Sequence, residues 1–373
     1  MTASEAAIFI YENEVPAFVE TEMERLYGNI FSSLTQFRIY GWTGGETSTY
    51  LVRQNDVPIV ILLFRRHDRG IQVLNEGIAL DDAELARFSE FMFSRYPDVN
   101  VISFKAIETT LKRMRFPHQR FNHLEDMTLA LPASADEYFA GLGKHTRHNI
   151  RRHLARIEEA FPSFRFEVFE KTEMTPQRVR EIIEFNRARM AEKNIVSIID
   201  ERETQHIVDL VQARGFVGVI TIDGRLCAGA ISFQSGQNYF LNVLAHDPCY
   251  DSYWLGFLCC YLTIRECIGR GGGEFHFLWG RYTYKFLLGA VQRDLDNVIV
   301  YRSRMRLLRN LDIACASARR GYVRALKIWL RYEDGFLAQR ARRLLERLRA
   351  WRRSARGSAV GGNAALLGAS QEK

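Results

Sequence analysis

Apolar and polar positions along the first third of the chain follow the pattern of short strands and one well-marked helix. Residues 12–38 are predicted to form a helical entry segment. Thr49–Leu51 and Val60–Phe64 flank Gln54-Asn55-Asp56, whose turn-forming residues indicate a hairpin. Apolar residues at helical spacing then predict a helix over Asp82–Arg95. Further strands are expected at Gly70–Gly77 and Val99–Ala106.

The second part opens with a capping box at Ser134 and Glu137, which predicts one helix running to about Ala160. Pro117 and Pro132 are expected to lie in the connection before it. Thr175-Pro176 is the start signal of another helix. A hairpin is predicted around Asp223-Gly224. The remaining expected elements are strands at Phe164–Phe169, Phe216–Ile222, Ala228–Phe233, Tyr239–Leu244 and Glu274–Leu278, and a buried helix at Trp254–Cys267.

Composition supports a folded protein, with 47% hydrophobic and 25% charged residues. The N-terminus lacks the basic start and apolar run of a secretory signal. No apolar run is long enough to predict a spanning helix. Cys259, Cys260 and Cys267 fall in one apolar stretch, where we expect small buried hydrophobes, and a reducing cytoplasm follows.

Charge is unevenly distributed along the chain. Residues 302–356 contain 17 Lys or Arg and four acids, so this segment carries +13 while the whole chain carries +7. We expect basic helices after Val300, broken at Gly321 and Gly335. In the last of these, an apolar stripe runs through Leu337, Ala341, Leu344, Leu348 and Trp351. The segment Arg302–Arg356 is therefore predicted to meet an anionic partner, either an anionic membrane surface or, less favoured, tRNA. The alternative is a docked structural helix or a solvated face.

Three local patterns occur in a fixed order after residue 130. The first is the basic helix beginning Lys144…Arg147…Asn149-Ile150-Arg151-Arg152. The second is Asp247-x-x-Tyr250-x-x-Tyr253-x-x-Gly256. The third is Phe275-x-Phe277-Leu278-x-Gly280-x-x-x-Tyr284-Lys285. Together they resemble the GNAT-like N-acyltransferase domain of acetyltransferases associated with cellulose and exopolysaccharide biosynthesis, a domain similar to the Fem-type aminoacyl ligases.

This resemblance implies an α/β (α+β) fold of tandem GNAT-like halves, with mixed, mostly antiparallel sheets flanked by helices and followed by basic C-terminal helices. Four segments are expected: a degenerate GNAT-like half at 1–130, the acyltransferase domain at 131–300, a basic helical extension at 301–356 and a disordered tail at 357–373.

The resemblance also implies a site at the end of the strand before the buried helix. Asp247 would orient or deprotonate an amine, and Tyr250 would contact substrate; the alternative for Asp247 is a turn residue that caps the helix. The N–H groups of the Tyr253-Trp254-Leu255-Gly256 turn would hold the phosphates of acetyl-CoA or another acyl-CoA. An ordinary helix start, with Gly256 needed for packing, is the alternative there.

Three more side chains are candidates for catalysis. His276 would be a base if its strand face lines the cleft, and otherwise a hydrogen-bonded, half-buried histidine. Tyr284 would protonate a thiolate, and Lys285 would bind a phosphate or carboxylate. The alternative for this pair is a surface ion pair beside a core tyrosine.

The basic face formed by Lys144, Arg147, Arg151 and Arg152 would bind a phosphate-bearing substrate, unless it is simply a solvated face. His145 and His148 have no carboxylate or cysteine at metal spacing, so no metal is assigned.

The leading functional hypothesis is transfer of an acyl group from acyl-CoA to an amine or hydroxyl of a cell-envelope or polysaccharide precursor, in the cytoplasm and peripherally on the inner membrane. One alternative is a Fem-type ligase that uses aminoacyl-tRNA. Another is a non-catalytic membrane-peripheral accessory. The absent Gln/Arg-x-x-Gly-x-Gly signature motivates the latter, as do Arg281-Tyr282, which replace the family's acidic residues. A further departure from the family is Trp254-Leu255, which stand in place of its Ser-Pro and alter the helix entrance.

Overall fold

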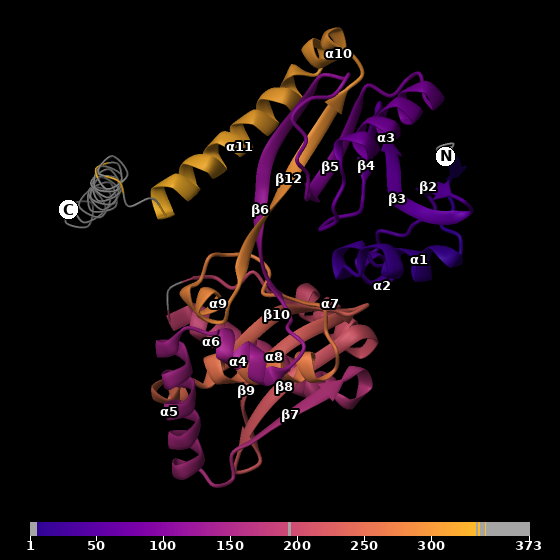
Figure 1. The fold of residues 1–373 in the computed structure, drawn as a ribbon. Coiled ribbons are helices and arrows are strands. Elements are labelled where there is room, and N and C mark those ends of the chain that lie inside the picture. The colour runs from indigo at the N-terminus through magenta and orange to yellow at the C-terminus, as the bar shows by residue number, and fades with distance from the viewer. Residues whose placement is uncertain (1–5, 193–194, 333–334, 336–339, 341–373) are drawn as a thin grey trace, which may run out of the picture. The chain divides into compact units, whose positions relative to one another are not determined.

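The computed structural model describes residues 6–192, 195–332, 335 and 340. Residues 1–310 form one compact unit and residues 311–373 a second. Within the described residues, twelve strands of the first unit form one sheet, in the order β1-β2-β3-β4-β5-β12-β6-β11-β10-β9-β8-β7 (Figure 1). The pairs β4–β5 and β10–β11 are parallel and all others are antiparallel. The predicted fold class, a mixed and mostly antiparallel α/β arrangement in two GNAT-like halves, is confirmed.

The first half agrees with the predicted hairpin and with the helix Asp82–Arg95. The hairpin turns at Asn55 and Asp56, whose positive φ values of 52° and 61° suit these turn-forming residues. Its elements are β1 (Ala7–Tyr11), α1 (Phe18–Tyr27), η1 (Ile30–Ser32), α2 (Leu34–Ile39), β2 (Thr47–Gln54), β3 (Val57–His67), β4 (Gly70–Val73), α3 (Asp82–Arg95), β5 (Val101–Ile107) and β6 (His118–Ala130).

The second half contains the strands predicted for it, with shifted ends, and more helices than were predicted. Its elements are α4 (Ala135–Gly141), α5 (Lys144–Ala160), β7 (Arg165–Glu170), η2 (Lys171–Glu173), α6 (Pro176–Glu192), α7 (Glu201–Arg214), β8 (Gly215–Ile222), β9 (Arg225–Ser235), β10 (Asn238–His246), η3 (Pro248–Tyr253), α8 (Leu255–Gly269), β11 (Glu274–His276), α9 (Thr283–Leu287), β12 (Val291–Tyr301) and α10 (Arg304–Arg309).

The local structure differs from the predictions in several places. The entry segment 12–38 is helical, as predicted, but it is divided into α1, η1 and α2, because Gly28 ends α1 in the left-handed region and Ser33 starts α2 as a cap. The predicted helix from Ser134 to Ala160 is two helices, interrupted by extended backbone at Leu142 and Gly143. The connection bounded by Pro117 and Pro132 contains a 13-residue strand, β6.

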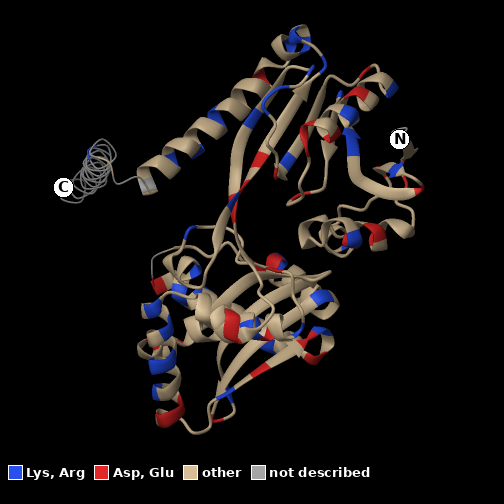
Figure 2. Ribbon diagram, viewed as in Figure 1, with Lys and Arg blue, Asp and Glu red and all other residues tan. Residues whose placement is uncertain are grey.

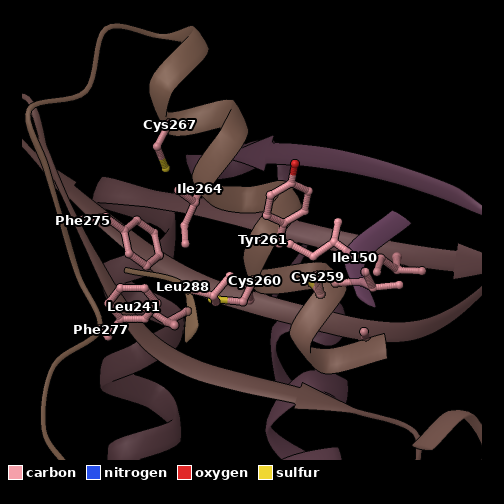
Figure 3. Packing of buried hydrophobic residues seen from close by; sticks show 14 of the residues in the cluster. Ile150, Leu241, Cys259, Cys260, Tyr261, Ile264, Cys267, Phe275, Phe277 and Leu288 are labelled. Carbon is pink, nitrogen blue, oxygen red and sulfur yellow. The ribbon is translucent and has the colours of Figure 1, made fainter. Parts of the chain in front are cut away.

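Each half buries both faces of its part of the sheet. In the first half, α3 covers one face through Leu85, Phe88 and Met92, and α1 and α2 cover the other. In the second half, α8 packs on one face together with α4 and α5, while α6 and α7 pack on the opposite face. Figure 3 shows Cys259, Cys260 and Cys267 of α8 among these apolar side chains, so the expected buried role of these cysteines is confirmed.

Strand exchange joins the two halves. β12 comes from the end of the second half but lies between β5 and β6, pairing antiparallel with both. β6 in turn pairs with β11 of the second half. Both strands therefore run from one half into the other, and burial along β6 is concentrated in residues 125–128.

The second unit is described through α11 (Leu311–Tyr332) and single residues beyond it. Its helix continues through Gly321, so the predicted break there is wrong. The predicted stripe from Leu337 to Trp351 and the tail 357–373 lie outside the described residues. None of the helices in the described ranges combines the length and hydropathy that a membrane-spanning segment requires.

Glycine allows α6 to approach the sheet, which generates a prediction. A Cβ added at Gly229 would lie 2.3 Å from Cδ1 of Ile182, which is itself fully buried. We expect Gly229→Ala to lower the free energy of unfolding by about 1–3 kcal/mol through overpacking, measured by urea denaturation. Gly141→Ala is the matched control, because a Cβ there meets nothing within 4 Å. Equal stability of the two variants would contradict the prediction.

Candidate active site

The parallel strands β10 and β11 separate soon after they meet. Their ladder contains two residue pairs, Tyr239–Phe275 and Phe240–His276. β10 then has an irregularity between Leu241 and Val243 and continues to His246, whereas the chain after His276 turns toward β6, where Phe277 N–H donates to Met127. The result is a wedge in the sheet. One side of residues 241–246 is therefore left without a β11 partner.

Lys285 fixes the wall of this wedge. Its side chain is 2% exposed, and its ammonium donates to the carbonyl oxygens of Phe277, Leu278 and Trp279 at 2.7, 3.0 and 2.6 Å. Burial lowers the pKa of Lys285 to about 8, while Asp126 raises it, so the ammonium form is the major one at pH 7. All three N–H donors are used inside the protein. The geometry thus differs from both alternatives stated above, a substrate contact and a surface ion pair.

His276 belongs to a buried chain of charges between β6, β11 and β12. Its Nδ1 lies 2.7 Å from Asp126 and its Nε2 lies 3.4 Å from Glu274, which is in turn paired with Arg293 at 2.7 Å. Burial lowers the pKa of His276, but the two carboxylates outweigh it and raise the pKa above its usual value. The pKa of Glu274 is lowered to about 2, chiefly by His276. The ring of His276 stacks on Phe240 with centroids 4.2 Å apart. This histidine is fully buried rather than half-buried.

A cavity of about 410 Å³ lies at the end of β10. Asp247 and Tyr250 both line it, so the structure brings these two predicted residues together. One oxygen of Asp247 accepts from Cys249 N–H at 2.9 Å, which is the predicted capping role, and the carboxylate keeps further acceptor sites. Burial and a hydrogen bond with the Cys227 thiol raise the pKa of Tyr250 to about 12. The remaining lining residues are Arg178, Glu181, Phe185, Gly224, Arg225, Leu226 and Cys227.

The start of α8 is closely covered. Trp254 stands in the left-handed region (φ 60°) and stacks on His153 with centroids 4.7 Å apart. The guanidinium of Arg156 lies 4.6 Å from the centre of the Tyr253 ring. Leu255 is fully buried, and a Cβ on Gly256 would lie 2.7 Å from Nδ1 of His246. Gly256 therefore has the packing role given above as the alternative, and a phosphate would have to reach the first-turn N–H groups past Trp254 and Arg156.

The basic helix α5 forms a groove with α4. Its cavity of about 460 Å³ is lined by Lys144, Arg147, His148 and Arg151, together with Phe139 and Ala140. Figure 2 shows the Lys and Arg positions spaced along α5. Arg152 does not join them, since its guanidinium contacts Nε2 of its neighbour His153. Three of the four predicted cations are thus brought together.

Tyr284 lies on α9, half-buried against the apolar cluster around α8, with its ring near Phe277 and Tyr282. Burial raises the pKa of Tyr284, so its hydroxyl is protonated at neutral pH. It does not line either cavity. Within the described ranges, no group of three or more His, Cys, Asp or Glu side chains is arranged to hold a metal ion.

Sequence reasoning missed several residues that the structure places at these sites. Asp126 and Arg293 complete the buried chain with His276, and Cys227 lies against Tyr250. The signal for Glu274 was present, because alternation places it on the same strand face as His276. Asp126 carried no such signal, since its segment was not predicted to be a strand.

Comparison with known proteins identifies the fold of the second half. Residues 144–286 match the family model of the acetyltransferase (GNAT) domain. No curated protein matches the chain. Among solved structures, FemX is similar with a TM-score of 0.57 and 8% identity over 78% of this chain and 96% of its own. L-PGS from Bacillus licheniformis has a TM-score of 0.48 and 14% identity over 79% and 93%. The FemX likeness shows a shared fold, and the chain carries a GNAT-fold acyltransferase domain.

The contacts of Lys285 generate a stability prediction. Lys285→Met would leave three carbonyl groups without their charged donor, and such bonds contribute about 1.5–3 kcal/mol each. Because these losses are not additive, we expect the free energy of unfolding to fall by about 3–5 kcal/mol, measured by urea denaturation. Lys112→Met removes an exposed lysine and should change it by less than about 0.5 kcal/mol. If the Lys285→Met protein were as stable as this control, the three hydrogen bonds of the Lys285 ammonium would not contribute to stability.

The buried His276 generates a pH prediction. Its folded pKa lies above the unfolded value of 6.5, so its stabilising contribution is complete below pH 6.5 and is lost as pH rises through the folded pKa. The stability difference between the wild type and His276→Gln should therefore shrink from acid to mildly alkaline pH. His67→Gln, at a histidine whose side chain is 91% exposed, should show no such trend. A pH-independent difference for His276→Gln would refute the assignment.

Proposed function

We propose that this protein transfers an acyl group from a CoA thioester to an amine or hydroxyl of a cell-envelope or polysaccharide precursor. The observation that carries the proposal is the cavity at the end of β10. It lies beside the strand that borders the wedge, and it gathers Asp247, Tyr250 and Cys227 with two arginines and Glu181. In a GNAT-fold acyltransferase domain, this combination offers both an acceptor for the nucleophile's proton and a donor for the leaving group.

Asp247 and Tyr250 have complementary roles in the proposed acyl transfer. The acceptor nitrogen or oxygen attacks the thioester carbonyl carbon, and the carbon–sulfur bond breaks. Asp247 takes the proton of the nucleophile. Tyr250, protonated at neutral pH because its pKa is raised to about 12, gives its proton to the thiolate. Backbone N–H groups along the open side of β10 stabilise the oxyanion that forms in between.

The basic groove supports an anionic substrate. Lys144, Arg147 and Arg151 face one cavity of about 460 Å³. The guanidinium of Arg151 lies 4.9 Å from the centre of the Phe139 ring, so this cation is held by an aromatic face as well as by its charge. A phosphate-bearing envelope precursor suits this lining better than a neutral sugar does.

A second donor is favoured by one specific observation. His246 occupies the space beneath Gly256, where other acyl-CoA enzymes of this fold would use the helix start for diphosphate. A donor that is not bound through a diphosphate at this helix start, such as the aminoacyl-tRNA of Fem-type ligases, would not be affected by the position of His246. The FemX-like fold and the cations of α5 are compatible with it.

The test is turnover by the full chain with labelled acetyl-CoA, and separately with aminoacyl-tRNA, against phosphate-bearing envelope precursors. We expect Asp247→Asn to lower kcat by about 10²–10⁴-fold, because the general base is lost. Asp209→Asn is the matched control on the exposed surface of α7. Turnover with aminoacyl-tRNA alone would transfer the proposal to the second donor. Undiminished activity of Asp247→Asn would refute the assigned mechanism, and failure with both donors would favour the non-catalytic accessory.

A further inference from the structure

One short stretch of the chain is rich in exposed large apolar side chains. Of the eighteen exposed large hydrophobic residues in the described ranges, seven lie between residues 304 and 332. The same stretch contains eight Lys or Arg and a single acid, Asp312. A stretch that is both strongly cationic and openly apolar is unusual for a surface that contacts only water.

Helix α11 carries an apolar arc and a cationic arc on opposite faces, although Ile313 falls within the cationic arc and Arg319 lies beside the apolar one. At 100° per residue, Leu311, Cys315, Tyr322 and Leu326 fall within an arc of about 60°, and Trp329 lies in the same arc. Arg320, Arg324 and Lys327 fall within a second arc of about 60° on the far side. Leu311, Tyr322 and Leu326 are 48%, 71% and 54% exposed. The apolar arc therefore faces outward along a helix of 22 residues.

We propose that α11 lies in the interface of an anionic lipid bilayer, with its apolar arc among the acyl chains and its cations against the headgroups. The presence of cations opposite the apolar arc favours an anionic lipid surface over other partners. An apolar partner protein or a second copy of the chain would need the apolar arc alone, and a nucleic acid would need the cations alone. Only an anionic lipid surface uses both faces of one helix. The residues in the apolar arc, with Leu, Tyr and Trp, are those typical of interfacial helices.

This inference does not rest on the proposed reaction, since a protein that lacks acyltransferase activity would bind lipid in the same way. If the reaction also holds, the acceptor would be met at the membrane surface.

The experiment is co-sedimentation of the full chain with vesicles of phosphatidylcholine, alone or mixed in equal parts with phosphatidylglycerol. We expect binding to the mixed vesicles only, weakened by salt. Lys327→Glu should reduce the partition coefficient by about 25-fold, which corresponds to about fivefold for each of two charges. Leu326→Glu should abolish binding, whereas Leu326→Phe should retain it, which separates loss of the apolar arc from loss of folding. Arg202→Glu on α7 is the charge-matched control and should bind like the wild type.

Three outcomes would overturn the proposal. Equal binding to both vesicle types would remove the role of charge. A change in oligomeric state in Leu326→Glu, without lipid binding by the wild type, would make the apolar arc an interface between copies. Salt-sensitive tRNA binding that survives Leu326→Glu, again without lipid binding, would assign the cations to nucleic acid.

Discussion

The ammonium of Lys285 binds three consecutive carbonyl groups, and the shape of the candidate site depends on that contact. Carbonyls of neighbouring residues in a strand point in alternate directions, so they converge on one cation only if the backbone turns sharply. Leu278 supplies the turn by adopting φ 55°, which is unfavourable for a leucine. The three hydrogen bonds compensate for this strain. As a result, β11 stops at His276 and leaves β10, and the wedge exists because the ladder ends there.

The same turn sets the position of the buried charges. Once the chain leaves β10, Phe277 and Leu278 exchange hydrogen bonds with Met127 of β6, one residue from Asp126. Asp126 then meets His276, and Arg293 on the neighbouring β12 meets Glu274. Charged groups buried in this way are costly unless each has a partner. The acids and bases alternate and pair in charge, so the exchange of β6 and β12 between the halves can pass through a polar centre.

Local signals in the sequence were sufficient for elements whose conformation is set by their own residues. The two hairpin turns were predicted because Asn55-Asp56 and Asp223-Gly224 act within a few residues, and α3 was predicted from the helical spacing of its own apolar residues. A comparable cap at Asp200 starts α7, which was nevertheless missed. The strand β6 had no such signal.

The difficulty with β6 is physical. Glu125, Asp126, Met127 and Thr128 are all buried in succession, so the polar–apolar alternation of a strand is absent. Their burial is possible only because of partners far away in the chain, such as His276. Distant contacts also determine the role of Lys285. The residue was singled out by the family pattern, but its hydrogen bonds depend on a backbone turn that the spacing of residues in the sequence does not reveal.

The start of α8 shows how one packing contact bears on the choice of donor. Phosphate binding at a helix start requires that the first N–H groups be reached from outside. Here His246 fills the side toward β10 and pairs with Asp251 at 2.6 Å, so that side is closed. The other side is bordered by Arg156 and by Trp254, which is 38% exposed. An anion that approaches there meets a guanidinium and an aromatic edge before it meets the backbone. Trp254-Leu255, which stand where the family carries Ser-Pro, therefore leave this helix start bordered by side chains, one of them Arg156 of α5, the helix that also carries the basic groove.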